Sequence, residues 1–114
     1  MSTVTIGITS REQASLRVIE AFKGNNMGNR ISFESYESLF KTLTLKRWDI
    51  LKALTGSDPL SIREAARLVG RDVKAVHGDI TALLNAGIVD KTENNKITFP
   101  YEKVHVDFEL SSVG

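Results

Sequence analysis

The sequence predicts one α+β domain, and three observations support this fold class. Apolar side chains recur at helical spacing through the middle of the chain. Shorter segments at both ends alternate apolar and polar residues, as half-buried strands do. The length of 114 residues suits one domain, and 41% hydrophobic and 25% charged residues are typical of a globular protein. We therefore expect helices and strands to share one core.

Residues 1–43 are expected to form a strand–helix–strand extension. Residues 4–8 alternate apolar side chains with smaller ones, which is the period of a half-buried strand. Ser10 stands where an N-cap is needed for a helix over 11–23, which carries its apolar residues on one side. After a polar, turn-rich segment, a second short strand is expected at 31–33.

The next two helices are predicted from their caps. Ser35 caps a helix that ends before Thr44, and Thr44 caps another helix with apolar residues at helical spacing through Leu54. The segment 56–59, with the sequence GSDP, is a clear helix breaker.

Two more helices are expected across a tight turn. Ser61 and Glu64 have the spacing of a capping box, which starts a helix that ends at Gly70. Asp72 caps the following helix, whose core stripe repeats regularly until Gly87, a left-handed C-terminal stop. These helices belong to a central part of the domain that we place at residues 44–100.

A hairpin and a terminal strand complete the expected fold. Residues 88–89 open the first strand of the hairpin, 93–95 form its tip, and 97–99 return. Within the C-terminal part, 101–114, residues 104–110 alternate apolar and charged side chains strictly, which predicts a strand.

The order of capped helix, capped helix, glycine turn, capped helix and hairpin is that of a winged helix-turn-helix. The segment RDVKAVHGDITALLNAGIV is similar to the recognition helix and following strand of MarR-type and DeoR-type prokaryotic regulators. The runs LTLKRWDILKAL, LSIREAARLVGRDVKAVHGDI and KITFPYEKV resemble a family of small archaeal and bacterial transcriptional regulators with a short strand-and-helix extension. Where related recognition helices commonly carry a basic pair, this chain has His77 and Gly78. The resemblance implies DNA binding and transcriptional regulation.

The core stripe of the helix near 72–86 predicts which of its sides faces solvent. At roughly 100° per residue, the side opposite the core carries Arg71, Lys74, Ala75, Gly78, Thr81 and Asn85. Recognition helices contact base edges through their N-terminal residues, where lysine or arginine suits guanine and an alanine methyl suits thymine. His77 and Asp79 lie on the flanks of this side, and Asp79 is expected to pair with a nearby base such as Arg67. There are alternative interpretations for two of these residues. Lys74 could be an ordinary surface lysine, and Gly78 could be a destabilising residue that the helix tolerates because packing stabilises it.

Further candidate contacts lie outside this helix. The hairpin near 88–99 has a polar, basic tip suited to the minor groove or the adjacent backbone. Ser61 stands at a helix N-terminus, where a phosphate could bind, although capping alone explains it equally well. The residues expected to bind DNA are Ser61, Arg63, Arg71, Lys74, Ala75, His77, Gly78, Thr81, Lys91, Asn94, Asn95 and Lys96.

The strands at the two ends of the chain have no partner within a minimal winged helix. We expect them to form a second small sheet, covered by the helix over 11–23. With the helix that bears Trp48, this sheet is expected to build a homodimer that reads two DNA half-sites about 34 Å apart. The alternative is an intramolecular sheet that only completes the core.

Composition excludes several other classes of function. The chain has no cysteine, so disulfides, thiolate catalysis and cysteine-based zinc sites are absent. The two histidines are far apart, no metal-ligand spacing occurs, and no nucleophile elbow is present, so we expect neither an enzyme nor a bound cofactor. No apolar run is long enough to span a membrane and no secretion signal is found, which predicts a cytoplasmic protein.

The net charge of +1 is nearly balanced, but its distribution favours nucleic acid. Between Arg63 and Lys74 the sequence has four basic side chains against two acidic ones. We therefore predict a transcriptional regulator that binds double-stranded DNA sequence-specifically and acts as a repressor by blocking polymerase. The alternative is a winged helix that binds a protein partner, such as an antitoxin that represses its own operon.

Overall fold

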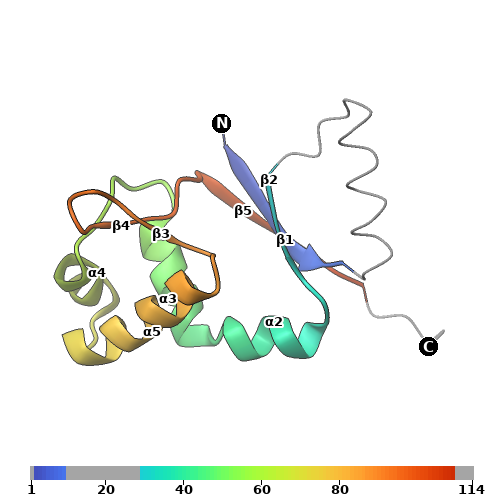
Figure 1. Cartoon of the computed structure of the whole chain (residues 1–114), viewed down its shortest axis with the longest axis horizontal. Coiled ribbons are helices and arrows are strands. Elements are labelled where there is room, and N and C mark those ends of the chain that lie inside the picture. The colour runs from blue at the N-terminus through green and yellow to red at the C-terminus, as the bar shows by residue number, and fades with distance from the viewer. Residues whose placement is uncertain (1, 10–28, 110–114) are drawn as a thin grey trace.

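The structure is a computed structural model, which describes residues 2–9 and 29–109. The expected helix over 11–23 lies outside these residues. The described part has an α+β fold in which a three-stranded sheet stands beside a group of helices and a short hairpin (Figure 1). The fold class is therefore confirmed at the level of an α+β arrangement.

Four helices lie within the described residues, and each begins at the predicted cap. The side chains of Ser35, Thr44, Ser61 and Asp72 accept hydrogen bonds from backbone N–H groups of the first turn that follows. Gly70 ends the third of these helices, as predicted, and has a left-handed conformation (φ 68°). Gly87 has the left-handed conformation that the sequence predicts after the last helix (φ 74°). The helices are α2 (Tyr36–Thr42), α3 (Leu45–Leu54), α4 (Ile62–Val69) and α5 (Val73–Asn85).

The strands at the two ends of the chain form a sheet of their own, as expected. The strands are β1 (Thr3–Ile8), β2 (Asn29–Phe33) and β5 (Lys103–Asp107). The order is β2-β1-β5, and both β2 and β5 run parallel to the central strand. The last strand ends at Asp107, earlier than the sequence predicted, so only the first part of the alternating segment pairs in the sheet.

The hairpin is shorter than predicted and has an additional partner. Its strands β3 (Asp90–Lys91) and β4 (Ile97–Thr98) pair antiparallel. The prediction that Ile88 and Val89 open the first strand is wrong, because the strand begins at Asp90. Ile88 and Val89 lie in the bend before it, and their side chains are buried in the core. Leu60 pairs with Ile97 through two backbone hydrogen bonds, of 2.9 and 2.7 Å, which extends the hairpin by the residue preceding Ser61.

One hydrophobic core joins the sheet to the helices. Val4 and Ile6 of β1 are fully buried in the same cluster as Leu39 of α2, Ile50 of α3 and Ile80 of α5. One face of the sheet therefore completes the core of the helical part, and the homodimer expected from this sheet stays a prediction.

The opposite face of the sheet is polar and closely packed around Gly7. A side chain at Gly7 would collide with the backbone oxygen of Asp107 and with the guanidinium group of Arg30. Arg30 Nε donates to the hydroxyl groups of Ser32 (3.0 Å) and Thr9 (3.3 Å), so the guanidinium group is held over the glycine. Glycine at this position is therefore required by the close approach of three strands.

We predict that Gly7→Ala lowers the free energy of unfolding by about 1–3 kcal/mol, because the added methyl group must displace backbone. Thr5→Ala is the control, since Thr5 lies on the same strand and face and should cost less than about 1 kcal/mol. Chemical denaturation measures both. Equal stability of the Gly7→Ala protein and the unmodified protein would contradict the packing described here.

Candidate nucleic-acid interface

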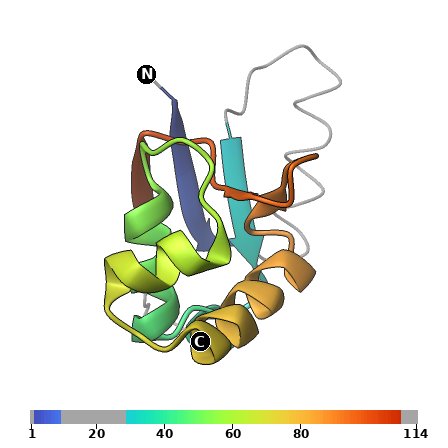
Figure 2. The same ribbon diagram turned by 90° about the vertical axis from the view of Figure 1, so that its left-hand side faces the viewer.

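The side of α5 that faces away from the core is exposed, as the sequence predicted. Val76, Ile80 and Leu83 are fully buried beneath the helix. The opposite side is open within the described part of the chain and carries the exposed residues Lys74, Ala75, His77, Gly78, Thr81 and Asn85. Figure 2 views the molecule from the end at which α4, α5 and the hairpin lie.

Arg71 does not lie on this exposed side, which corrects the sequence-based expectation. Its guanidinium Nη2 contacts the carboxylate Oδ2 of Asp79 at 2.9 Å, and only 20% of its side chain is exposed. The Nη1 atom is also buried and has no hydrogen-bond partner among the described residues. Arg71 is therefore a structural residue, because its long side chain turns back from the start of α5 to a carboxylate within the helix.

Asp79 binds two arginines from different parts of the chain. In addition to Arg71, its Oδ1 accepts a hydrogen bond of 3.0 Å from Nε of Arg47 on α3. The expected partner Arg67 is instead exposed on α4. The Arg47 side chain also donates from Nη1 to the backbone oxygen of Thr42 (2.9 Å). Asp79 thus connects α5 to α3, and through Arg47 also to the end of α2 at Thr42.

The same contacts determine the protonation of Asp79. Burial of the carboxyl group by itself raises its pKa, but the hydrogen bonds and positive charges of Arg47 and Arg71 outweigh that effect. The pKa of Asp79 therefore lies below its usual value, and the group is ionised at neutral pH.

The N-termini of α4 and α5 are capped within the chain. Ser61 Oγ accepts from the backbone N–H of Glu64 at 3.1 Å, and Glu64 Oε1 accepts from the N–H of Ser61 at 3.0 Å. This backbone hydrogen bond is the main reason that the pKa of Glu64 is lowered. Asp72 accepts from the N–H groups of Lys74 and Ala75 in the same way. Of the two interpretations of Ser61, the structure therefore supports capping, while Arg63 in the following turn is exposed.

The hairpin tip carries the exposed polar residues that the sequence assigned to it. Thr92 and Lys96 close the tip through hydrogen bonds of 2.7 and 3.1 Å, and Asn95 adopts the left-handed conformation (φ 62°). The positive charge of Lys96 contributes to the lowered pKa of Glu64, so the tip lies near the start of α4. The exposed residues are Lys91, Asn94, Asn95 and Lys96.

Among the described residues, no group of three histidine, aspartate or glutamate side chains could hold a metal ion. None of the helices in residues 29–109 combines the length and the apolar character needed to cross a bilayer.

Sequence reasoning did not identify Arg47, since no local pattern links it to Asp79.

A protein-family model described as HVO_A0114 matches residues 42–106, which is more than half of the chain. No curated protein matches the chain. One solved structure with a detectable likeness is described as "The structure of a protein with unknown function from Listeria innocua Clip11262". It has 15% sequence identity and a TM-score of 0.45, and the match covers 77% of this chain. The chain spans 61% of the length of that structure.

We predict that Asp79→Asn lowers the free energy of unfolding by about 1–3 kcal/mol at neutral pH, because two largely buried guanidinium groups lose their counter-charge. The pKa of Asp79 is lower in the folded protein, so its contribution is present above the unfolded pKa and lost as pH falls through the folded value. The stability difference between the two proteins should therefore shrink below about pH 4.

Chemical denaturation at several pH values checks this prediction. Lys41→Gln, a change at an exposed residue of α2, serves as a control for a substitution remote from the carboxylate. A difference between the Asp79→Asn and unmodified proteins that persists unchanged into acid would show that the ion pairs are not its source.

Proposed function

We propose that the chain, which belongs to the HVO_A0114 family, is a winged helix-turn-helix protein that binds double-stranded DNA sequence-specifically. In this proposal α5 enters the major groove, and the hairpin formed by β3 and β4 contacts the flanking groove or backbone. The observation that carries the proposal is the exposed side of α5, which bears Lys74 and Ala75 in its first turn.

The order and connection of the elements support the winged-helix assignment. The helices α4 and α5 are separated only by the turn at Gly70, Arg71 and Asp72, as in a helix-turn-helix. The hairpin follows α5 directly, and the bridge between Leu60 and Ile97 attaches it to the residue before α4. A hairpin that follows the second helix and is attached next to the start of the first suits the wing of such a domain.

The side chains in the first turn of α5 suit direct contact with bases. Lys74 can donate to the O6 and N7 acceptors of guanine, and the methyl group of Ala75 suits the methyl group of thymine. Lys74 makes no ion pair within the described residues, and the side chains of Lys74 and Ala75 are both exposed. Both are therefore available to a groove.

Gly78 supports a close approach to this side of the helix. A Cβ atom at Gly78 would meet nothing within 4 Å, so packing within the described chain does not require glycine there. Glycine inside a helix costs about 1 kcal/mol relative to alanine. Contact of the helix backbone with the wall of a groove would explain why the side chain is absent.

Exposed cations near this surface suit the phosphate backbone. Arg63 and Arg67 of α4 and Lys91 and Lys96 of the hairpin are all exposed. Phosphate contacts of this kind give affinity that falls as salt rises, whereas base contacts give specificity. We propose that the protein acts as a repressor, because a small protein bound at a promoter blocks polymerase directly.

One observation favours a second function, the binding of a protein partner through the same surface. Arg71 is held by Asp79, and the carboxylate of Asp72 stands at the start of α5. The exposed side of α5 is therefore less basic than the sequence suggested. A surface with both positive and negative side chains suits a protein partner that also carries both. An antitoxin that represses its own operon would combine the two functions.

We predict that Lys74→Ala weakens binding to the specific duplex by about 1–3 kcal/mol and relaxes base preference at one position. The measurement is fluorescence anisotropy with duplexes from the region upstream of the chain's own gene, over a range of salt concentrations. Lys41→Ala on α2 is the matched control and should leave affinity unchanged. Equal affinity and preference for the Lys74→Ala and unmodified proteins would favour the protein-partner alternative.

We predict opposite effects of Gly78→Ala on stability and on DNA binding. The free energy of unfolding should rise by about 0.5–1 kcal/mol, because alanine favours the helix and its methyl group meets no other atom. Affinity for the duplex should fall several-fold, because the methyl group separates helix and groove. Since this protein is more stable than the unmodified one, weaker binding could not result from unfolding. Unchanged affinity would contradict a close approach at Gly78.

A further inference from the structure

The strand β5 is an edge of the three-stranded sheet. Within residues 2–9 and 29–109 it pairs only with β1. The N–H of Lys103 donates to the oxygen of Ser2 at 3.2 Å, on the side of β1. Because backbone groups alternate along a strand, those of Val104 and Val106 point to the free edge. The edge therefore presents donors and acceptors that another strand could pair with.

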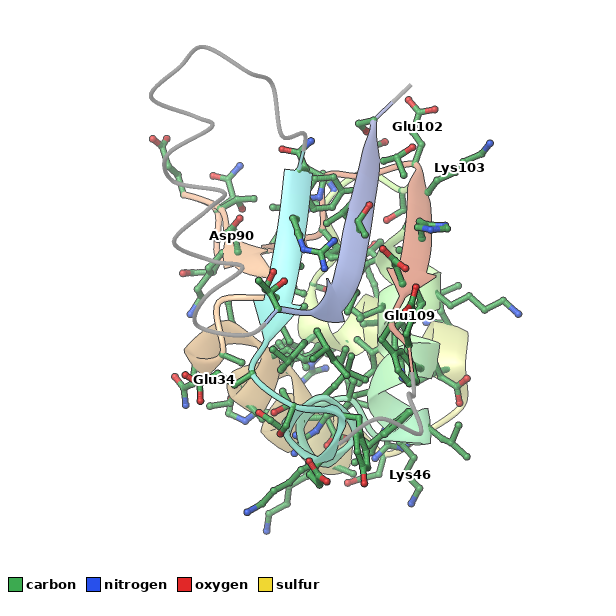
Figure 3. The ribbon with its side chains drawn as sticks, turned by 90° about the vertical axis from the view of Figure 1, so that its right-hand side faces the viewer. Glu34, Lys46, Asp90, Glu102, Lys103 and Glu109 are labelled. Atoms are coloured by element: carbon green, nitrogen blue, oxygen red, sulfur yellow. The ribbon has the colours of Figure 1, made fainter. Side chains whose placement is uncertain are left out.

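Exposure distinguishes this edge from the other one. Four of the five residues of β5 are exposed, including Val106, of which 45% is accessible to solvent. In β2, the opposite edge, three of the five residues are partly buried. Lys103 extends away from the sheet beyond β5 (Figure 3). The free edge of β5 is thus the more accessible of the two.

The charges on β5 are complementary to those of the same strand turned through 180°. Lys103, His105 and Asp107 share one face, since their partners on β1 are alternate residues. In an antiparallel pair centred on His105, Lys103 of each copy stands opposite Asp107 of the other. Opposite charges directly across two strands stabilise the pair, and like charges destabilise it. Pairing with another copy in this register is therefore favoured.

Apolar groups on the other face of β5 suit the same arrangement. A hollow of about 330 Å³ lies beside the strand, lined in part by Trp48, Leu51 and Val104. In the register centred on His105, the exposed Val106 of the second copy stands opposite Val104, at this hollow. The arrangement would cover an apolar side chain that is exposed in the single chain.

We propose that β5 pairs antiparallel with β5 of a second copy of this chain, about a two-fold axis at His105. The two three-stranded sheets then form one six-stranded sheet, with Val104 and Val106 supplying the hydrogen bonds across the axis. The inference does not rest on DNA binding. If both hold, the dimer carries two copies of α5 and can read two half-sites.

Charge reversal tests this pairing in the absence of DNA. The unmodified protein should sediment as a species of twice 12.6 kDa at micromolar concentration. Positions 103 and 107 face each other at two places in the dimer, one on each side of the axis. Lys103→Asp or Asp107→Lys alone therefore puts like charges opposite each other at both places, and should raise the dimer dissociation constant about tenfold or more. The double variant with both changes restores opposite charges and should return the constant to near its original value.

Two further variants serve as controls. Glu93→Lys reverses a charge at the hairpin tip, away from β5, and should leave the dimer unchanged. Glu109→Lys lies beyond the residues paired in this register and should also have little effect. Circular dichroism confirms that each variant is folded. The proposal would be overturned if the unmodified protein were a monomer or if the single reversals had no effect on the dimer. It would also be overturned if the double variant dimerised no more tightly than the single variants, or if Glu109→Lys weakened the dimer. A monomer whose DNA binding still depends on Lys74 would overturn this inference and leave the proposed function intact.

Discussion

The contact between Asp79 and its two arginines links the helices α3 and α5 through side chains outside the hydrophobic core. It joins α5 to Arg47 of α3 at 3.0 Å and to Arg71, in the turn before α5, at 2.9 Å. The Asp79 side chain is 18% exposed, and the charges of the two guanidinium groups compensate for the partial loss of water around its carboxylate. Together with the buried stripe of Val76, Ile80 and Leu83, the contact holds α5 against the rest of the helical part. The polar side chains that remain on α5 therefore face outward together.

Local features of the fold could be predicted from the sequence. The caps at Ser35, Thr44, Ser61 and Asp72 pair residues two or three positions apart, so their spacing alone identifies them. The exposed side of α5 was also predictable, because the buried stripe of Val76, Ile80 and Leu83 determines the opposite side.

Contacts between distant residues could not be predicted in this way. Arg47 is 32 positions from Asp79, and Leu60 pairs with Ile97 on a later strand. A helical projection gives the direction of the Cα–Cβ bond, but a long side chain such as Arg71 can turn back and change its exposure. The terminal strands were expected, whereas their parallel order, with β1 between β2 and β5, depends on the tertiary fold.

The most direct test of the account is a map of the amide groups affected by DNA. Two-dimensional NMR spectra of the labelled protein, recorded while a duplex from its own upstream region is added, give that map. The account predicts the largest shift changes in the first two turns of α5 and in the hairpin tip at Asn94 and Asn95. Changes confined to α2 and the sheet, or no saturable changes with any such duplex, would contradict it.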